Sequence, residues 1–254
     1  MPPTAGPPMR LPRPRPSTRL EAMITVHHLN HSRSHRVLWL LEELGLEYEI
    51  RRYERNPLTL SAPASLKQVH ALGKAPAVVD AGRTLAESGA ILETLVERHG
   101  AGRLAPAAGT EERERYTYWM HYAEGSAMPA LVLRLIFSQM PKQPMPALAR
   151  PVVRALAKNV VDTFVQPQID QHLDYMETEL SKATWFAGAD FTAADIQMSF
   201  PIEAAAAGGS VDGGRPLLRA YVQRIRERPA YRRAVDKGGP YDLGNVTGAP
   251  GSRG

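Results

Sequence analysis

The chain has 254 residues, 43% of them hydrophobic, no cysteine and a formal net charge of +5. A chain of this size can bury a substantial core in one large domain or two of ordinary size. The absence of cysteine excludes disulfide bonds, thiolate metal sites and a nucleophilic thiol belonging to the protein itself. That absence fits a cytoplasmic protein. No apolar run reaches the roughly 18 residues that cross a bilayer, so we expect a soluble protein without a membrane partner.

The positive charge is concentrated at the start of the chain. Residues 1–22 contain four arginines and one acidic residue, which account for +3 of the net charge of +5. The remaining body is close to neutral, so we expect no nucleic-acid partner. The proline-rich composition of residues 1–22 predicts a disordered extension ahead of Met23, and residues 237–254, rich in glycine and proline, predict a disordered tail.

Residues 23–100 predict an α/β domain. Residues 24–29 alternate weakly and predict a strand, and an apolar stripe from Val37 to Leu44 predicts a helix that ends at Gly45. Residues 48–53 predict a second strand, parallel to the first if the connection is right-handed. A short helical piece near residues 66–70 follows, then two short strands around 77–79 and 84–85 and a helix over 87–98.

After a linker at residues 100–110, residues 108–236 predict an all-helical domain. One long helix begins near residue 111 and should bend at Pro129, and a second covers residues 152–180 with a kink at Pro167. Residues 140–151 predict a loop between them. Thr192 and Asp195 have the spacing of a capping box, and the last predicted helix covers residues 216–228. A group of basic residues near the end predicts a solvated helix face: Arg224, Arg226, Arg228, Arg232 and Arg233.

Residues 72–93 combine the features of a small-ligand site. Pro76 precedes a short apolar strand, and Glu87 and Ser88 stand where the next helix should begin. The free N–H groups of a helix N-terminus attract a carboxylate, and the Glu87 carboxylate can bind an ammonium group. A carboxylate site next to an ammonium site suits the α-amino acid end of a peptide.

The predicted order of elements, with four sequence segments, resembles the glutathione transferase superfamily. The segments are residues 32–44, 73–76, 87–91 and 191–195, and the resemblance extends over residues 23–235. The first helix and residues 70–76 are most similar to a fungal and bacterial subgroup of theta-like members. The resemblance implies a thioredoxin-like N-terminal domain, an all-α C-terminal domain and a homodimer.

The resemblance also implies roles for individual residues in binding glutathione. Pro76 would follow a cis peptide bond, and the backbone of Ala75 would pair with the cysteinyl part of glutathione. Glu87 and Ser88 would hold the γ-glutamyl end. Lys74 would reach the glycyl carboxylate.

A hydroxyl that donates to sulfur favours the thiolate of glutathione, whose free thiol has a pKa of ~8.5. In theta-like transferases this hydroxyl lies in the turn after the first strand. Ser32 is the favoured candidate, because Ser34 is expected to cap the helix; Ser34 and Asn30 remain alternates, and the family's position could also fall on His31. Tyr118 and Tyr122 either line the pocket for the second substrate or belong to the core.

We therefore predict a glutathione transferase that joins the glutathione thiolate to small, apolar electrophiles in detoxification. One alternative is a glutathione-dependent peroxidase or disulfide reductase of the same fold. A second is a non-catalytic interaction scaffold. Four histidines near the start do not have the arrangement of a metal site, so we expect glutathione as co-substrate and no metal: His27, His28, His31 and His35.

Overall fold

The computed structural model describes residues 23–56, 59, 61–211, 214–239, 241 and 243. The predicted extension, residues 1–22, and most of the predicted tail lie outside the described residues. Within the described part of the chain, no helix is long and apolar enough to cross a membrane.

The N-terminal half begins with a parallel β-α-β unit. Strands β1 (Ile24–Leu29) and β2 (Tyr48–Tyr53) pair in parallel and are joined by helix α1 (Ser34–Leu44). Gly45 ends α1 with a left-handed backbone (φ 69°), a conformation that glycine adopts at little cost. The three elements agree with the sequence prediction to within a residue or two.

Two antiparallel strands and a helix complete this half. After a 3-10 turn (η1, Ala64–Gln68), β3 (Ala77–Asp80) pairs with β1 and with β4 (Arg83–Ala86), and α2 (Ser88–His99) follows. The sheet order is β2-β1-β3-β4. The predicted thioredoxin-like domain is confirmed.

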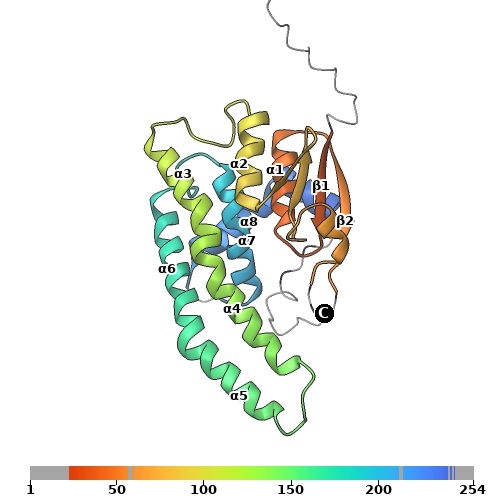
Figure 1. Ribbon diagram of the computed structural model, residues 1–254. Coiled ribbons are helices and arrows are strands. Elements are labelled where there is room, and N and C mark those ends of the chain that lie inside the picture. Colours follow the sequence, from red (N-terminus) through yellow and green to blue (C-terminus); the bar gives the residue numbers. More distant parts are fainter. Residues whose placement is uncertain are drawn as a thin grey trace, which may run out of the picture.

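The second half is helical, and in Figure 1 it lies beside α1 and α2 and extends well beyond the sheet. Helices α3 and α4 run end to end alongside α6 and α5. The helix bounds are Glu111–Tyr122 (α3), Met128–Gln139 (α4), Arg150–Val160 (α5), Gln166–Lys182 (α6), Ala193–Ala207 (α7), Pro216–Glu227 (α8) and Pro229–Gly238 (α9).

The two predicted helix bends take the form of π-helical turns. Such turns occupy Ala123–Ala127 (η2), just before Pro129, and Val161–Val165 (η4), just before Pro167. Proline lacks an N–H and its ring crowds the carbonyl four residues earlier, and a π turn leaves room for that ring without ending the helix. The predicted loop at 140–151 contains a short 3-10 turn (η3, Met140–Lys142), and α5 begins inside it at Arg150.

The core is continuous across the two halves. Helix α1 contacts the sheet on one side and α7 and α9 on the other, and most of α1 and α7 is buried. At the start of α7 the Thr192 side chain and the Asp195 carboxylate form the predicted capping box. This packing holds the first turn of α1 and the start of α2 against the helical half.

The prediction of a solvated arginine face near the C-terminus is only partly right. Arg226, Arg232 and Arg233 are exposed, but some of the arginines also pair with acids of α1. Arg228 donates two hydrogen bonds to Glu43 of α1 (2.6 and 2.9 Å), and Arg233 donates to Glu42 (2.7 Å). Helix α9, which the sequence analysis did not predict, carries Arg233 and extends two residues into the predicted tail. The basic residues therefore hold α9 against α1, because their acidic partners lie on an element distant in sequence.

Candidate functional site

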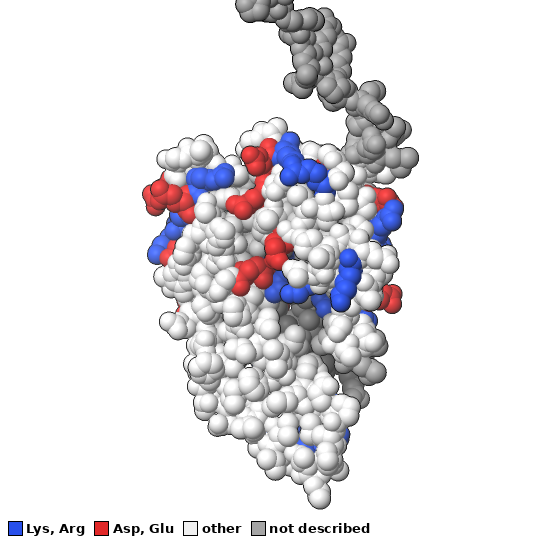
Figure 2. Space-filling model, viewed as in Figure 1, with Lys and Arg blue, Asp and Glu red and all other residues white. Residues whose placement is uncertain are grey.

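A cavity of about 240 Å³ lies where β3 and α2 begin, against the helical half. All five residues predicted to bind glutathione line it: Lys74, Ala75, Pro76, Glu87 and Ser88. The remaining lining residues are Arg33, His70, Leu72, Ala86 and Glu124. We call this the first cavity. In Figure 2, side chains of both charge signs gather over the region between the two halves, whereas the face shown over α4 and α5 is mostly uncharged.

The backbone around the first cavity has two unusual features. The Ala75–Pro76 peptide bond is cis, as predicted. Glu87 has φ 67° and ψ 121°, and such a positive φ costs a non-glycine residue about 1–3 kcal/mol. This unusual backbone places Glu87 directly before the free N–H groups of α2, whose first residue is Ser88.

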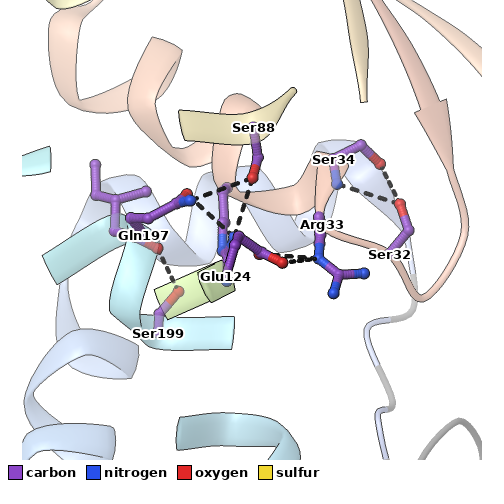
Figure 3. A network of polar contacts seen from close by, with 9 residues as sticks. Ser32, Arg33, Ser34, Ser88, Glu124, Gln197 and Ser199 are labelled. Carbon is purple, nitrogen blue, oxygen red and sulfur yellow. Dashed lines mark hydrogen bonds and ion pairs between the residues drawn. The ribbon is translucent and has the colours of Figure 1, made fainter. Parts of the chain in front are cut away.

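A polar network connects Ser88 to the helical half, as Figure 3 shows. The Ser88 hydroxyl accepts hydrogen bonds from Arg36 Nη1 (3.2 Å) and Gln197 Nε2 (3.3 Å). Arg36 Nη1 also donates to Glu124 Oε1 (2.6 Å) and Gln197 Oε1 (3.1 Å). Residues from α1, α2, η2 and α7 thus meet at the base of the first cavity.

The charges of this network are only partly balanced. Arg36 is fully buried, and burial lowers its pKa although the nearby Glu124 carboxylate opposes the shift. Arg33 Nε donates to both oxygens of Glu124 at 2.9 Å. Burial alone would raise the pKa of Glu124, but the charges of Arg36 and Arg33 outweigh it and lower that pKa. Two guanidinium groups share one carboxylate, which leaves this wall of the cavity attractive to an anion.

The candidates for thiol activation lie in the turn between β1 and α1. The Ser32 hydroxyl donates to Leu29 O (2.8 Å), accepts from Ser34 N–H (3.2 Å) and lies 2.7 Å from Ser34 Oγ. Ser32 is 3% exposed and is not among the residues that line the first cavity; its neighbour Arg33 is.

Ser34 and Asn30 make contacts that belong to the fold. Ser34 is the first residue of α1 and not its cap: its hydroxyl accepts from Leu29 N–H (3.1 Å) and lies 2.9 Å from Nδ1 of the buried His28. Burial lowers the pKa of His28 to about 4. Asn30 Oδ1 accepts from the N–H of Arg55 (3.0 Å). The expectation that Ser34 caps α1 is thus wrong, because its hydroxyl is hydrogen-bonded to the end of β1 at Leu29.

A second cavity, of about 210 Å³, adjoins the first and shares Arg33 with it. Its other lining residues are His31, Arg55, Met128, Leu131, Val132, Leu135, Phe200, Ala204 and Leu243. Tyr118 and Tyr122 are not among them. Their rings pack with Trp119 in an aromatic cluster on α3, where the Tyr122 hydroxyl lies 2.6 Å from His172 Nδ1.

The histidines near the start of the chain have other partners. His27 Nδ1 lies 2.9 Å from the Tyr53 hydroxyl, and the ring of His35 stacks on Tyr241 with centroids 4.1 Å apart. Within the residues that the structure describes, no group of three or more His, Cys, Asp or Glu side chains is placed to hold a metal ion.

Comparison with known proteins matches both halves to one family. The family models for the N-terminal and C-terminal domains of glutathione S-transferase match residues 21–97 and 145–229. Glutathione S-transferase 3 of Schizosaccharomyces pombe is 37% identical over 219 residues, which cover 85% of this chain and 88% of that protein. The chain belongs to the glutathione S-transferase family. Glutathione S-transferase 1 of Saccharomyces cerevisiae is 32% identical, over 72% of this chain and 81% of that protein.

Solved structures of glutathione S-transferases have the same fold. One from Actinobacillus pleuropneumoniae superposes with a TM-score of 0.71 at 31% identity, covering 89% of this chain and 99% of that one. A sphingomonad glutathione S-transferase solved in complex with glutathione gives a TM-score of 0.64 at 25% identity, covering 85% and 98%. The protein is therefore a glutathione transferase enzyme in architecture and family.

Sequence reasoning missed three residues with polar or charged side chains that line the first cavity of this transferase. Arg33 lies between Ser32 and Ser34, the two serine candidates for thiol activation, and His70 begins the segment 70–76 that carries part of the resemblance. Their neighbours in sequence could therefore have indicated both residues. Glu124 could not be found in this way. It comes from a π-helical turn of the other domain, and no local pattern indicates that it pairs with Arg33 and Arg36.

Proposed function

We propose that the protein binds glutathione in the first cavity and transfers its thiolate to a small electrophile held in the second. The observation that carries the proposal is the meeting of Lys74, Ala75, Pro76, Glu87 and Ser88 in one cavity, although they come from two separate segments of sequence.

Each group at this cavity suits one part of glutathione. The Glu87 carboxylate binds the γ-glutamyl ammonium, and Ser88 with the N–H groups of α2 binds the adjacent carboxylate. The backbone of Ala75 pairs with the cysteinyl residue. The Lys74 ammonium binds the glycyl carboxylate.

Ser32 is the residue that we assign to thiol activation. Its hydroxyl accepts from Ser34 N–H and donates to Leu29 O. To activate the thiol, the hydroxyl proton turns from Leu29 O to sulfur, and the contact with Ser34 N–H is kept. The positive charge of Arg33 and the N-terminus of α1 favour the thiolate further. The proton of the thiol leaves to solvent, sulfur forms a bond to the electrophilic carbon, and the leaving group departs with the electron pair of its own bond.

The proposed electrophile site is the second cavity and not the predicted pair Tyr118 and Tyr122. The second cavity adjoins the first through Arg33, so a molecule bound there lies close to the glutathione sulfur. Holding both reactants in this way supplies much of the rate enhancement.

Homodimer formation, a cytoplasmic location and a role in detoxification belong to the same proposal. Large apolar side chains are exposed along α5 and the turn that follows it, among them Val152, Leu156 and Phe164, and they offer a surface to a second copy. Light scattering coupled to size-exclusion chromatography decides this: twice the mass of one chain is expected, and the mass of one chain excludes the dimer.

Retention on immobilised glutathione, followed by turnover assays, tests the proposal. We expect retention that free glutathione reverses, and conjugation of a generic aryl halide. Turnover of a peroxide without conjugation would indicate the peroxidase alternative, and retention without either reaction would indicate a binding scaffold. If glutathione does not retain the protein, the proposed binding site is wrong.

A further inference from the structure

Arg33 is the one described residue that lines both cavities. A sulfur atom bound in the first cavity and a carbon atom bound in the second can form a bond only where the two cavities adjoin, which is beside this side chain. Arg33 also directly follows Ser32, the residue assigned to thiol activation. The Arg33 guanidinium therefore lies where the reacting atoms of the two substrates would meet.

Two contacts hold the Arg33 guanidinium in place. Its Nε donates to both oxygens of Glu124, at 2.9 Å each, and Nη1 of the buried Arg36 holds the same carboxylate at 2.6 Å. The guanidinium carbon of Arg33 lies over the Phe200 ring, 5.1 Å from its centre. A charged donor that is fixed in this way before the substrate binds needs little reorganisation during the reaction.

The two terminal nitrogens of Arg33 are the donors that remain for a ligand. Neither has a hydrogen-bond partner among the residues that the structure describes, and Figure 3 shows both directed away from the Glu124 carboxylate. The Arg33 side chain is 32% exposed, so a bound molecule can reach them. Their N–H groups would donate charge-assisted hydrogen bonds to an oxygen of the electrophile.

The class of electrophile decides whether a donor at this place accelerates the reaction. When sulfur adds to the β-carbon of a conjugated ketone or aldehyde, the electron pair of the carbon–carbon double bond moves toward the carbonyl, and its oxygen becomes an enolate. The α-carbon then takes a proton from solvent, which replaces the proton that the thiol released. When sulfur displaces chloride from an alkyl chloride, the electron pair leaves with chloride and no oxygen gains charge. A donor aimed at the carbonyl oxygen therefore stabilises only the first transition state.

We propose that Arg33 is a catalytic residue that donates from its terminal nitrogens to the carbonyl oxygen of conjugated ketones and aldehydes, and that such compounds are the substrate class that the site favours. The apolar part of the substrate packs in the second cavity against Met128, Leu131 and Phe200. The volume of this cavity, about 210 Å³, suits a single ring or a short chain. The inference rests on the proposed transferase function, because glutathione must supply the thiolate.

Benzylideneacetone and benzyl chloride test the substrate class on the unaltered protein. In both compounds the glutathione sulfur bonds to the carbon that carries the phenyl ring, but only the ketone gains charge on an oxygen. We expect kcat/KM, divided by the uncatalysed rate constant of each compound, to be about tenfold or more higher for the ketone, as a charged hydrogen bond would give. An equal or lower value for the ketone overturns the proposal. Failure of the proposed function appears separately, as turnover of neither compound.

Arg33→Gln assigns the preference to the terminal nitrogens. The amide nitrogen of glutamine occupies the same place along the side chain as Nε of arginine, so this variant can keep a donor to Glu124 while it loses both terminal nitrogens. Weaker stabilisation of the thiolate would lower kcat/KM for both compounds alike, so the ratio of the two values isolates the effect on the carbonyl. We expect that ratio to fall about tenfold or more, and Arg33→Lys, whose ammonium also donates, to restore part of it.

Arg115→Gln is the matched control. Arg115 is similarly exposed and also pairs with a glutamate, Glu179 (3.0 Å), but it lines neither cavity. Its substitution should leave the ratio unchanged. Equal losses for both compounds in Arg33→Gln would limit Arg33 to the thiolate, and a raised KM for glutathione with an unchanged ratio would assign it to glutathione binding. Either result overturns the proposal.

Discussion

Ser88 is the residue at which ligand binding and the joining of the two halves meet. Its hydroxyl accepts from Arg36 and Gln197, and it lines the first cavity at the N-terminus of α2. Arg36 and Gln197 are only 0% and 1% exposed, so these two donors have little access to water. Removing the oxygen would leave a buried guanidinium and a buried amide each short of one acceptor.

Ser88→Ala is expected to weaken glutathione binding about tenfold or more, because a hydrogen bond that involves a charged group contributes about 1.5–3 kcal/mol. The KM for glutathione should rise while the KM for an aryl halide changes little. Ser181→Ala, at an exposed helical serine, is the matched control. Glutathione kinetics that are the same in both variants would show that Ser88 does not contact the ligand.

The residues of the first cavity differ in how far sequence alone could place them. Pro76, Glu87 and Ser88 were found because strand, turn and helix signals stand close together in the chain. Glu124 reaches the cavity only through packing of two domains, which no local pattern encodes. Tyr118 and Tyr122 illustrate the reverse case: aromatic residues at helical spacing pack with each other and with Trp119 and stay away from both cavities.

At the scale of elements, the docking of α9 on α1 depends on buried carboxylates. The Glu42 carboxylate accepts from the Tyr48 hydroxyl (2.7 Å), from Arg233 and from Lys237. Burial alone would raise the pKa of Glu42, but the hydrogen bonds from Lys237, Arg233 and Tyr48 outweigh it, and the pKa lies below its ordinary value of 4.5. The ionised form is therefore the one that the folded state favours.

Glu42→Gln should lower the free energy of unfolding by about 1–2 kcal/mol near neutral pH. Because the pKa of Glu42 is lower in the folded state, its stabilising effect is present above about pH 4.5 and is lost as the pH falls through the folded-state value. Urea unfolding at several pH values should show the difference between the two proteins shrinking in acid. A constant difference would mean that Glu42 stabilises by shape and not by charge. Glu47→Gln, at an exposed position, should have no comparable effect.

The elements themselves were mostly predictable, and the exceptions have a physical cause. Strand alternation, apolar stripes and the capping box at Thr192 identify their elements because each signal lies within a few residues. Helix α9 follows α8 after a single residue and is rich in charged residues. Such a sequence predicts a solvent-exposed segment, because the acidic residues of α1 that pair with it are distant in sequence. The packing of this segment as a helix depends on contacts with residues distant in sequence, which local composition does not predict.

At the scale of the whole molecule, Glu124 is the principal electrostatic contact between the halves at the first cavity. It binds Arg33 and the fully buried Arg36, both from the N-terminal half. Removing one partner of a buried ion pair leaves the other charge without compensation, which costs more than the pair contributes when intact. The contact therefore matters for both stability and the shape of the cavity.

Glu124→Gln is expected to lower the free energy of unfolding by about 2–3 kcal/mol. This is less than the ~3–5 kcal/mol of a fully buried pair because the Glu124 side chain is 33% exposed. Chemical denaturation measures this, with Glu114→Gln, an exposed acid of α3, as control. The double variant Arg36→Met, Glu124→Gln should lose less free energy of unfolding than the sum of the losses in the two single variants. Strict additivity would contradict the proposed coupling.

The central claim, that the chain binds glutathione and stabilises its thiolate, is tested most directly by the pKa of the bound thiol. The ultraviolet absorbance of the thiolate, followed against pH in the complex, should give a pKa clearly below the ~8.5 of a free thiol. Ser32→Ala should return that pKa toward the free value. A bound thiol that titrates as free glutathione does, or a lowered pKa that Ser32→Ala leaves in place, would contradict the account.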